Sequence, residues 1–102
     1  MKTEMTNERR REIEIRAIHQ YGISSQQEMC IEEMAELTKA LCKLRRHIEN
    51  APEFYKTHEN VVEEIADVQI MLDQMRMIFG STADMEDYKL NRLWARMEAS
   101  NA

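Results

Sequence analysis

The chain has 102 residues, of which 43% are hydrophobic and 32% are charged, with one proline and two glycines. This length indicates a single domain spanning residues 1–102, and the composition is typical of a soluble, mostly helical protein. The net charge of −5 argues against binding of a nucleic-acid polymer, which needs a basic surface, but leaves a single nucleotide open as a ligand.

No apolar run approaches the length of a membrane span, so we expect no membrane partner. Cys30 and Cys42 would lie too far apart on one helix to form a disulfide, and two unpaired cysteines indicate a reducing compartment. The N-terminal residues MKTEMTNERRREIEIR lack the apolar segment of a signal peptide. We therefore expect a cytoplasmic protein.

Apolar periodicity and end signals predict four helices and no strand. The first helix is expected from about residue 6 to 20, and Gly22 follows it as a C-terminal cap. Ser25-x-x-Glu28 is a capping-box pattern, which predicts the start of a second helix that runs to about residue 48.

The segment from residue 49 to 57 contains the proline and breaks the periodicity, which predicts the longest loop. A capping pattern, Asn60-x-x-Glu63, predicts the start of a third helix that ends just before Gly80. A fourth helix is expected over about 84–98. Four helices with short connections predict an all-α, four-helix bundle-like fold.

Two acidic motifs lie on the second and third helices: Glu32-Glu33-Met34-Ala35-Glu36 and Glu64-Ile65-Ala66-Asp67. Each places two carboxylates three positions apart, so that both project from one helical face. The two faces continue as Met, Ala, Leu and Ile, which indicates that the carboxylates point into an interior crevice. Carboxylates that converge there need a cation, and oxygen ligands suit Mg²⁺, with Mn²⁺ as a substitute. The expected metal ligands are therefore Glu33, Glu36, Glu64 and Asp67.

Two other interpretations of these acids were weighed. A single E-x-x-E pair is often a surface feature, paired here with Lys39, Lys43 or other cations, but two motifs on apolar faces favour the metal site. A di-iron carboxylate bundle needs Glu-x-x-His on two helices, and His19, His47 and His58 all miss that spacing.

The fourth helix carries an apolar stripe and, beside it, a basic stripe of Lys89, Arg92 and Arg96. Taken alone, the basic stripe is typical of a solvated face. With a polyphosphate held at a nearby metal, Lys89 and Arg92 become expected phosphate contacts.

The pair of acidic motifs resembles the signature of the MazG-like all-α nucleoside triphosphate pyrophosphohydrolases, especially small, single-domain, phage-type members. The likeness covers most of the chain: Tyr21-Gly22, Gln26-x-x-Met29, Leu37-x-Lys39-Ala40-Leu41, Met71-Leu72-Asp73-Gln74 and Lys89-Leu90-x-Arg92-Leu93. It implies a Mg²⁺-dependent enzyme that splits a (deoxy)nucleoside triphosphate into a nucleoside monophosphate and pyrophosphate.

The resemblance also implies roles for particular residues and an assembly. Its metal ligands would be Glu33, Glu36, Glu64 and Asp67, its catalytic residues Glu32 and Glu63, and its substrate or phosphate contacts Gln26, Lys39, Lys89 and Arg92. The implied assembly is a homo-oligomer, either a dimer or a tetramer built as a dimer of dimers. A third helix that is apolar on nearly every side agrees with such burial between chains.

Two features depart from the family pattern. Residues 37–63 separate the motifs by more than is usual in this group, so the loop before Asn60 is expected to be an insertion near the site. No Tyr-His follows the second motif, which argues against the related phosphoribosyl-ATP pyrophosphatase of histidine synthesis. The alternative function is a non-enzymatic helical binding or regulatory module that retains the fold and the metal site.

Overall fold

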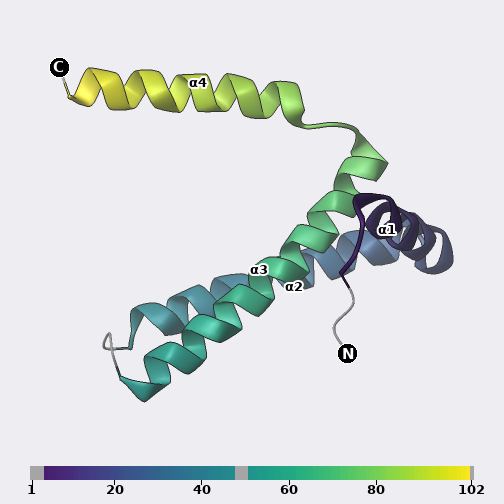
Figure 1. Cartoon of the computed structure of the whole chain (residues 1–102), viewed down its shortest axis with the longest axis horizontal. Helices are drawn as coiled ribbons and strands as arrows, with labels where there is room; N and C mark the ends of the chain where they lie inside the picture. The colour runs from purple at the N-terminus through teal and green to yellow at the C-terminus, as the bar shows by residue number, and fades with distance from the viewer. Residues whose placement is uncertain (1–3, 48–50, 102) are drawn as a thin grey trace.

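The computed structural model describes residues 4–47 and 51–101, which lie almost entirely in helices joined by short connections (Figure 1). The four helices are α1 (Asn7–Tyr21), α2 (Ile23–Arg45), α3 (Pro52–Phe79) and α4 (Ala83–Ser100). The described residues contain no strand, which confirms the expected all-α class. None of these helices combines the length and the apolar character that crossing a membrane requires.

Several helix ends follow the signals in the sequence. The Thr6 hydroxyl accepts a hydrogen bond of 3.0 Å from the backbone N–H of Arg9 and so caps the start of α1. Gly22 separates α1 from α2 with a φ of 92°, and Gly80 ends α3 with a φ of 114°. Both values lie where a side chain would strain the backbone, so glycine is the residue suited to each position.

The expected starts of the second and third helices are wrong. α2 begins before Ser25, which therefore lies inside the helix and caps nothing. α3 begins at Pro52 and not at Asn60, because proline suits the first turn of a helix, where its missing N–H leaves no bond unmade. The loop expected over residues 49–57 is helical from Pro52 onward, and residues 48–50 lie outside the described part of the chain.

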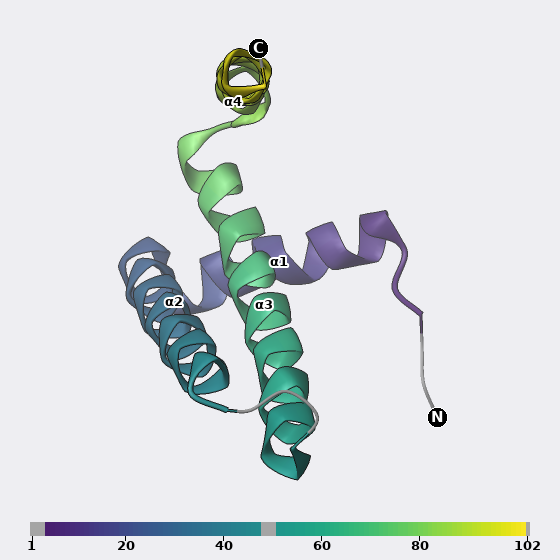
Figure 2. The same cartoon turned by 90° about the vertical axis from the view of Figure 1, so that its left-hand side faces the viewer.

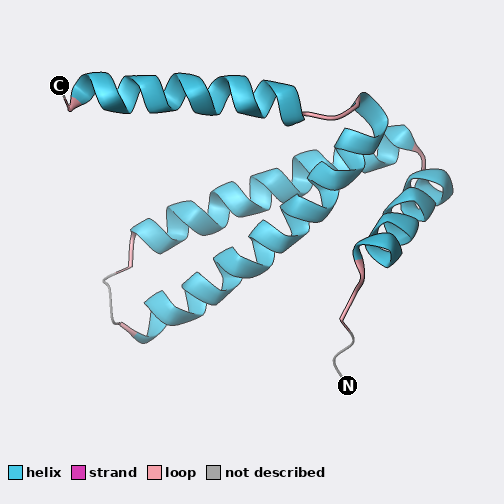
Figure 3. Cartoon of the chain, turned by 45° about the horizontal axis from the view of Figure 1, so that its top comes forward, coloured by secondary structure: helices cyan, strands magenta, loops and turns pink. Residues whose placement is uncertain are grey.

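α2 and α3 run antiparallel to each other and form the most extensive helix–helix contact (Figure 3). Cys30 and Ala40 from α2 and Val61, Val68 and Met71 from α3 are the buried apolar residues of this contact. Near the Gly22 end of the pair, the side-chain amide of Gln26 donates a hydrogen bond of 2.6 Å to that of Gln74. This buried pair joins the two helices, and α1 crosses them at the same end.

α4 extends away from the other three helices and packs against none of them (Figures 1 and 2). None of its residues is buried, and the Trp94 side chain is 61% exposed. The four-helix bundle expected from the sequence is therefore not closed within one chain: α1, α2 and α3 pack together and α4 stands apart. The amphipathic pattern of α4 requires a cover for its apolar face but does not specify which molecule provides it.

α1 contributes a buried carboxyl group to its contact with α3. Glu14 is only 6% exposed, and its Oε2 atom has no hydrogen-bond partner among the described residues. Burial raises the pKa of Glu14 to about 7, with the neighbouring Asp73 carboxylate adding to the effect and Arg10 opposing it. Arg10 and Arg76 contact Asp73 at 3.5 and 3.3 Å, so two cations offset the negative charge of the carboxylate beside Glu14.

We expect the stability of the fold to fall as the pH rises through the titration of Glu14. Its folded-state pKa lies above the ordinary value of 4.5, so the folded chain binds more protons than the unfolded chain, and the free energy of unfolding decreases from about pH 4.5 to about pH 7. Glu14→Gln should remove this dependence and stabilise the protein at pH 8 by on the order of 1 kcal/mol. Thermal unfolding followed by circular dichroism at several pH values measures both effects.

The exposed Glu28 of α2 supplies the matched control, since Glu28→Gln makes the same chemical change outside this contact. An unchanged pH dependence in Glu14→Gln would show that the Glu14 carboxyl does not titrate differently in the folded chain.

Candidate metal centre

Three carboxylates from two helices meet midway along the α2–α3 pair. One ligand oxygen each from Glu33 of α2 and from Glu64 and Asp67 of α3 lies within 4.8 Å of the other two. Glu33 and Glu64 are partly buried and Asp67 is exposed, so the cluster opens to solvent on one side. Each motif puts its carboxylates on one helical face, and the antiparallel pairing of α2 and α3 in this register brings three of them together.

The electrostatics of this cluster disfavour three negative charges. Partial burial raises the pKa of Glu33, and the nearby charges of Asp67, Glu64 and Glu36 raise it further. The pKa of Glu64 is raised in the same way, first by partial burial and then by Asp67, Glu36 and Glu63. The ion pairs found among the described residues include none of these carboxylates.

The donor set fits a hard divalent cation. Glu64 has a buried Oε2 atom with no hydrogen-bond partner among the described residues, which is the condition that a bound cation would relieve. Mg²⁺ and Mn²⁺ prefer oxygen ligands and bind through one to a few carboxylates while keeping some water. Glu33, Glu64 and Asp67 on two rigid helices offer that arrangement.

The fourth expected ligand lies beside this cluster. Glu36 is exposed on α2, one turn beyond Glu33, and it is not among the carboxylates whose oxygens lie within 4.8 Å of one another. Its negative charge nevertheless raises the pKa of both Glu33 and Glu64. Glu36 therefore stands at the rim of the cluster, on the side toward the end of α2.

The two expected catalytic residues flank the cluster from opposite helices. Glu63 is exposed on α3, next to Glu64, and its charge contributes to the raised pKa of that residue. Glu32 is exposed on α2 beside Glu33.

The expected substrate contacts are spread over the chain. Gln26 is buried and hydrogen-bonded to Gln74, so the structure places it in the core and not on a binding surface. Lys39 is exposed on α2, between Glu36 and the end of the helix. Lys89 and Arg92 lie on α4, where the Arg92 guanidinium stacks 5.8 Å from the centre of the Tyr88 ring, and this chain does not bring them to its own carboxylates.

Comparison with known proteins identifies no relative of this chain. No protein-family model matches the chain, and no curated protein or solved structure matches it significantly. A function for this chain therefore rests on its own motifs and on the geometry of the carboxylates.

Sequence reasoning missed a second group of polar side chains near the loop end of the α2–α3 pair. Lys43 from α2 and His47, just beyond the end of α2, line a cavity there together with Lys56, Thr57 and Asn60 from α3. Because residues 49–57 were predicted to form a loop, Lys56 and Thr57 were not expected to lie on α3. The spacing of Lys56-x-x-x-Asn60, one helical turn apart, was the signal that both lie on one face of α3.

Mg²⁺ should stabilise the protein, and the effect should depend on the cluster. A ligand present at about ten times its dissociation constant stabilises the folded state by roughly 1.4 kcal/mol, which corresponds to a rise in Tm of several degrees for a domain of this size. Glu64→Gln should raise the Tm measured in EDTA, because it removes one of the repelling charges, and should reduce the rise caused by Mg²⁺. Scanning fluorimetry with Mg²⁺ and with EDTA tests both, with Glu28→Gln as the control. A lower Tm in EDTA for Glu64→Gln would instead indicate that the carboxylate has a structural partner.

Proposed function

We propose that the chain is a Mg²⁺-dependent nucleoside triphosphate pyrophosphohydrolase, which converts a (deoxy)nucleoside triphosphate into the monophosphate and pyrophosphate. The observation that supports it best is the meeting of Glu33, Glu64 and Asp67 from the two acidic motifs, whose pattern resembles the MazG-like enzymes. When bound, Mg²⁺ neutralises charge on the phosphate oxygens and lowers the pKa of a coordinated water.

Each carboxylate has a role in this proposal. Glu33, Glu64 and Asp67 hold the metal, and Glu36 completes the set from the rim. Glu32, exposed beside Glu33 on α2, accepts a proton from the water that attacks the α-phosphorus. The bond between the α-phosphorus and the α–β bridging oxygen then breaks, and pyrophosphate leaves on the opposite side. Glu63 orients Glu64 from the neighbouring position on α3.

A homo-oligomer is the second part of the proposal. α4 exposes an apolar stripe of Leu90, Leu93, Trp94 and Met97, with exposed fractions of 61, 43, 61 and 45%. It packs against no other helix in the described part of the chain. A stripe of this kind is typical of a surface covered by another molecule. Because Lys89 and Arg92 lie on the same helix, they would contact phosphate in the site of a neighbouring copy, in a dimer or tetramer.

Hydrolysis should be tested with a panel of ribo- and deoxyribonucleoside triphosphates in Mg²⁺. We expect equal amounts of monophosphate and pyrophosphate, no reaction in EDTA, and a loss of kcat of at least about 100-fold in Glu33→Gln, because a metal ligand is removed. Release of inorganic phosphate would contradict cleavage at the α–β bond. Metal-dependent nucleotide binding without turnover would identify the chain as a binding or regulatory module.

The oligomer should depend on the apolar face of α4. Leu93→Glu places a charge in the centre of that face and should convert the assembly into a monomer, because a buried unpaired carboxylate costs several kcal/mol. Ala95→Glu introduces the same charge on the other side of the helix and should leave the assembly intact. Light scattering coupled to size exclusion measures the mass of each. A monomeric wild-type protein would contradict this part of the proposal.

A further inference from the structure

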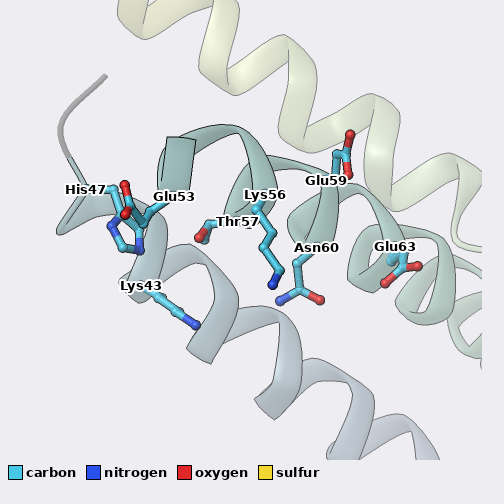
Figure 4. Close-up of a pocket in the computed structure, with 8 residues that line it drawn as sticks. All are labelled: Lys43, His47, Glu53, Lys56, Thr57, Glu59, Asn60 and Glu63. Atoms are coloured by element: carbon cyan, nitrogen blue, oxygen red, sulfur yellow. The ribbon is translucent and has the colours of Figure 1, made fainter. Parts of the chain in front are cut away.

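The α2–α3 pair borders a half-open cavity of about 500 Å³ close to its loop end (Figure 4). Residues from both helices line it, among them Lys43, His47, Lys56, Thr57, Asn60 and Glu63. In Figure 4 the ends of the Lys43 and Lys56 side chains and the Asn60 amide converge on the space between the helices, whereas Glu59 points away from it. The cavity therefore presents these donors, beside the carboxylates of Glu53 and Glu63, to whatever occupies it.

Two of these donors are the ammonium groups of lysines. Neither Lys43 nor Lys56 takes part in an ion pair among the described residues, although Glu53, Glu59 and Glu63 also line the cavity. The Nε2 atom of His47 is buried and has no hydrogen-bond partner in the described part of the chain. A buried ring nitrogen without a hydrogen-bond partner destabilises the folded state unless a ligand supplies the missing hydrogen bond.

We propose that this cavity binds the pyrophosphate half of the substrate, an inference that rests on the proposed function. Phosphate oxygens accept charge-assisted hydrogen bonds from ammonium groups, and Thr57 and Asn60 add neutral donors.

The position of the cavity agrees with a phosphate chain that runs along the α2–α3 pair. Lys43 lies two turns beyond Glu36 on α2, which at 1.5 Å per residue is roughly 10 Å along the helix. Glu63 lines the cavity and is adjacent to Glu64 of the cluster, so the two sites are continuous. The α-phosphate then lies at the carboxylates, the β- and γ-phosphates extend toward Lys43 and Lys56, and the nucleoside lies on the opposite side of the cluster.

Binding of inorganic pyrophosphate in EDTA, measured by calorimetry, tests the cavity without the metal or turnover. We expect the Lys43→Ala/Lys56→Ala variant to bind pyrophosphate at least about tenfold more weakly than wild type. The control is Arg45→Ala/Arg46→Ala, which removes the same charge from exposed positions outside the cavity and should change affinity by less than about twofold. Circular dichroism establishes that each variant is folded, and Lys43→Arg/Lys56→Arg should restore part of the affinity.

Measuring the binding of each product, the nucleoside monophosphate and pyrophosphate, tests the proposed orientation of the triphosphate along the α2–α3 pair. The lysine double variant should bind a nucleoside monophosphate in Mg²⁺ as wild type does, while its KM for the triphosphate rises. Weakened monophosphate binding with unchanged pyrophosphate binding would overturn the inference, as would equal losses in the lysine and arginine double variants.

The two proposals fail in different ways. Wild-type KM in the lysine double variant would overturn the cavity assignment and leave the pyrophosphohydrolase intact. The wild-type protein could instead hydrolyse no triphosphate and still bind pyrophosphate through the two lysines. That result would contradict the proposed enzymatic activity, and with it the assignment of the cavity to the substrate of that enzyme. Glu64→Gln separates the sites directly, since it should lose turnover and keep its binding of pyrophosphate in EDTA.

Discussion

Repulsion among the carboxylates midway along the α2–α3 pair is the unfavourable interaction that the packing of these two helices must offset. Packing the two helices brings oxygens of Glu33, Glu64 and Asp67 within 4.8 Å, partly out of water, and raises the pKa of Glu33 and Glu64. Apolar contacts on both sides of the cluster and the buried Gln26–Gln74 hydrogen bond hold the helices together against this repulsion. A divalent cation would convert the repulsion into ligation, which is the physical argument for the proposed metal site.

The charge of the polar side chains, and the ion pairs they make, differ from one end of the α2–α3 pair to the other. At the end that α1 crosses, a buried Glu14 shares a site with Asp73, and two arginines compensate the charge. The middle holds the carboxylates of Glu33, Glu64 and Asp67, and the loop end holds the cavity lined by Lys43 and Lys56. In the proposed function, a polyphosphate would lie along this pair of helices with its reacting phosphorus at the carboxylates.

In the proposed homo-oligomer, α4 would link the carboxylate site of one copy to a neighbouring copy. It carries the apolar stripe around Trp94 and the basic residues Lys89 and Arg92 on one helix, and it touches no other helix of its own chain. Covering the apolar stripe with a second copy would remove it from water and place the basic residues against that copy. Contact between the two copies would then add buried apolar surface to a chain with a small core. It would also bring Lys89 and Arg92 to the phosphate site of the other copy.

Local signals in the sequence were enough to determine the helical class, the glycine-ended helices at Gly22 and Gly80, and the shared face of each acidic motif, because these depend on neighbours three or four residues away. Only the tertiary structure decided that Gln26 lies in the core, that Lys43 and Lys56 converge on one cavity, and that α4 leaves the bundle. These outcomes depend on which helix packs against which face and in what register. Periodicity in the sequence states that a face must be covered, but the partner is selected by packing between distant segments or separate chains.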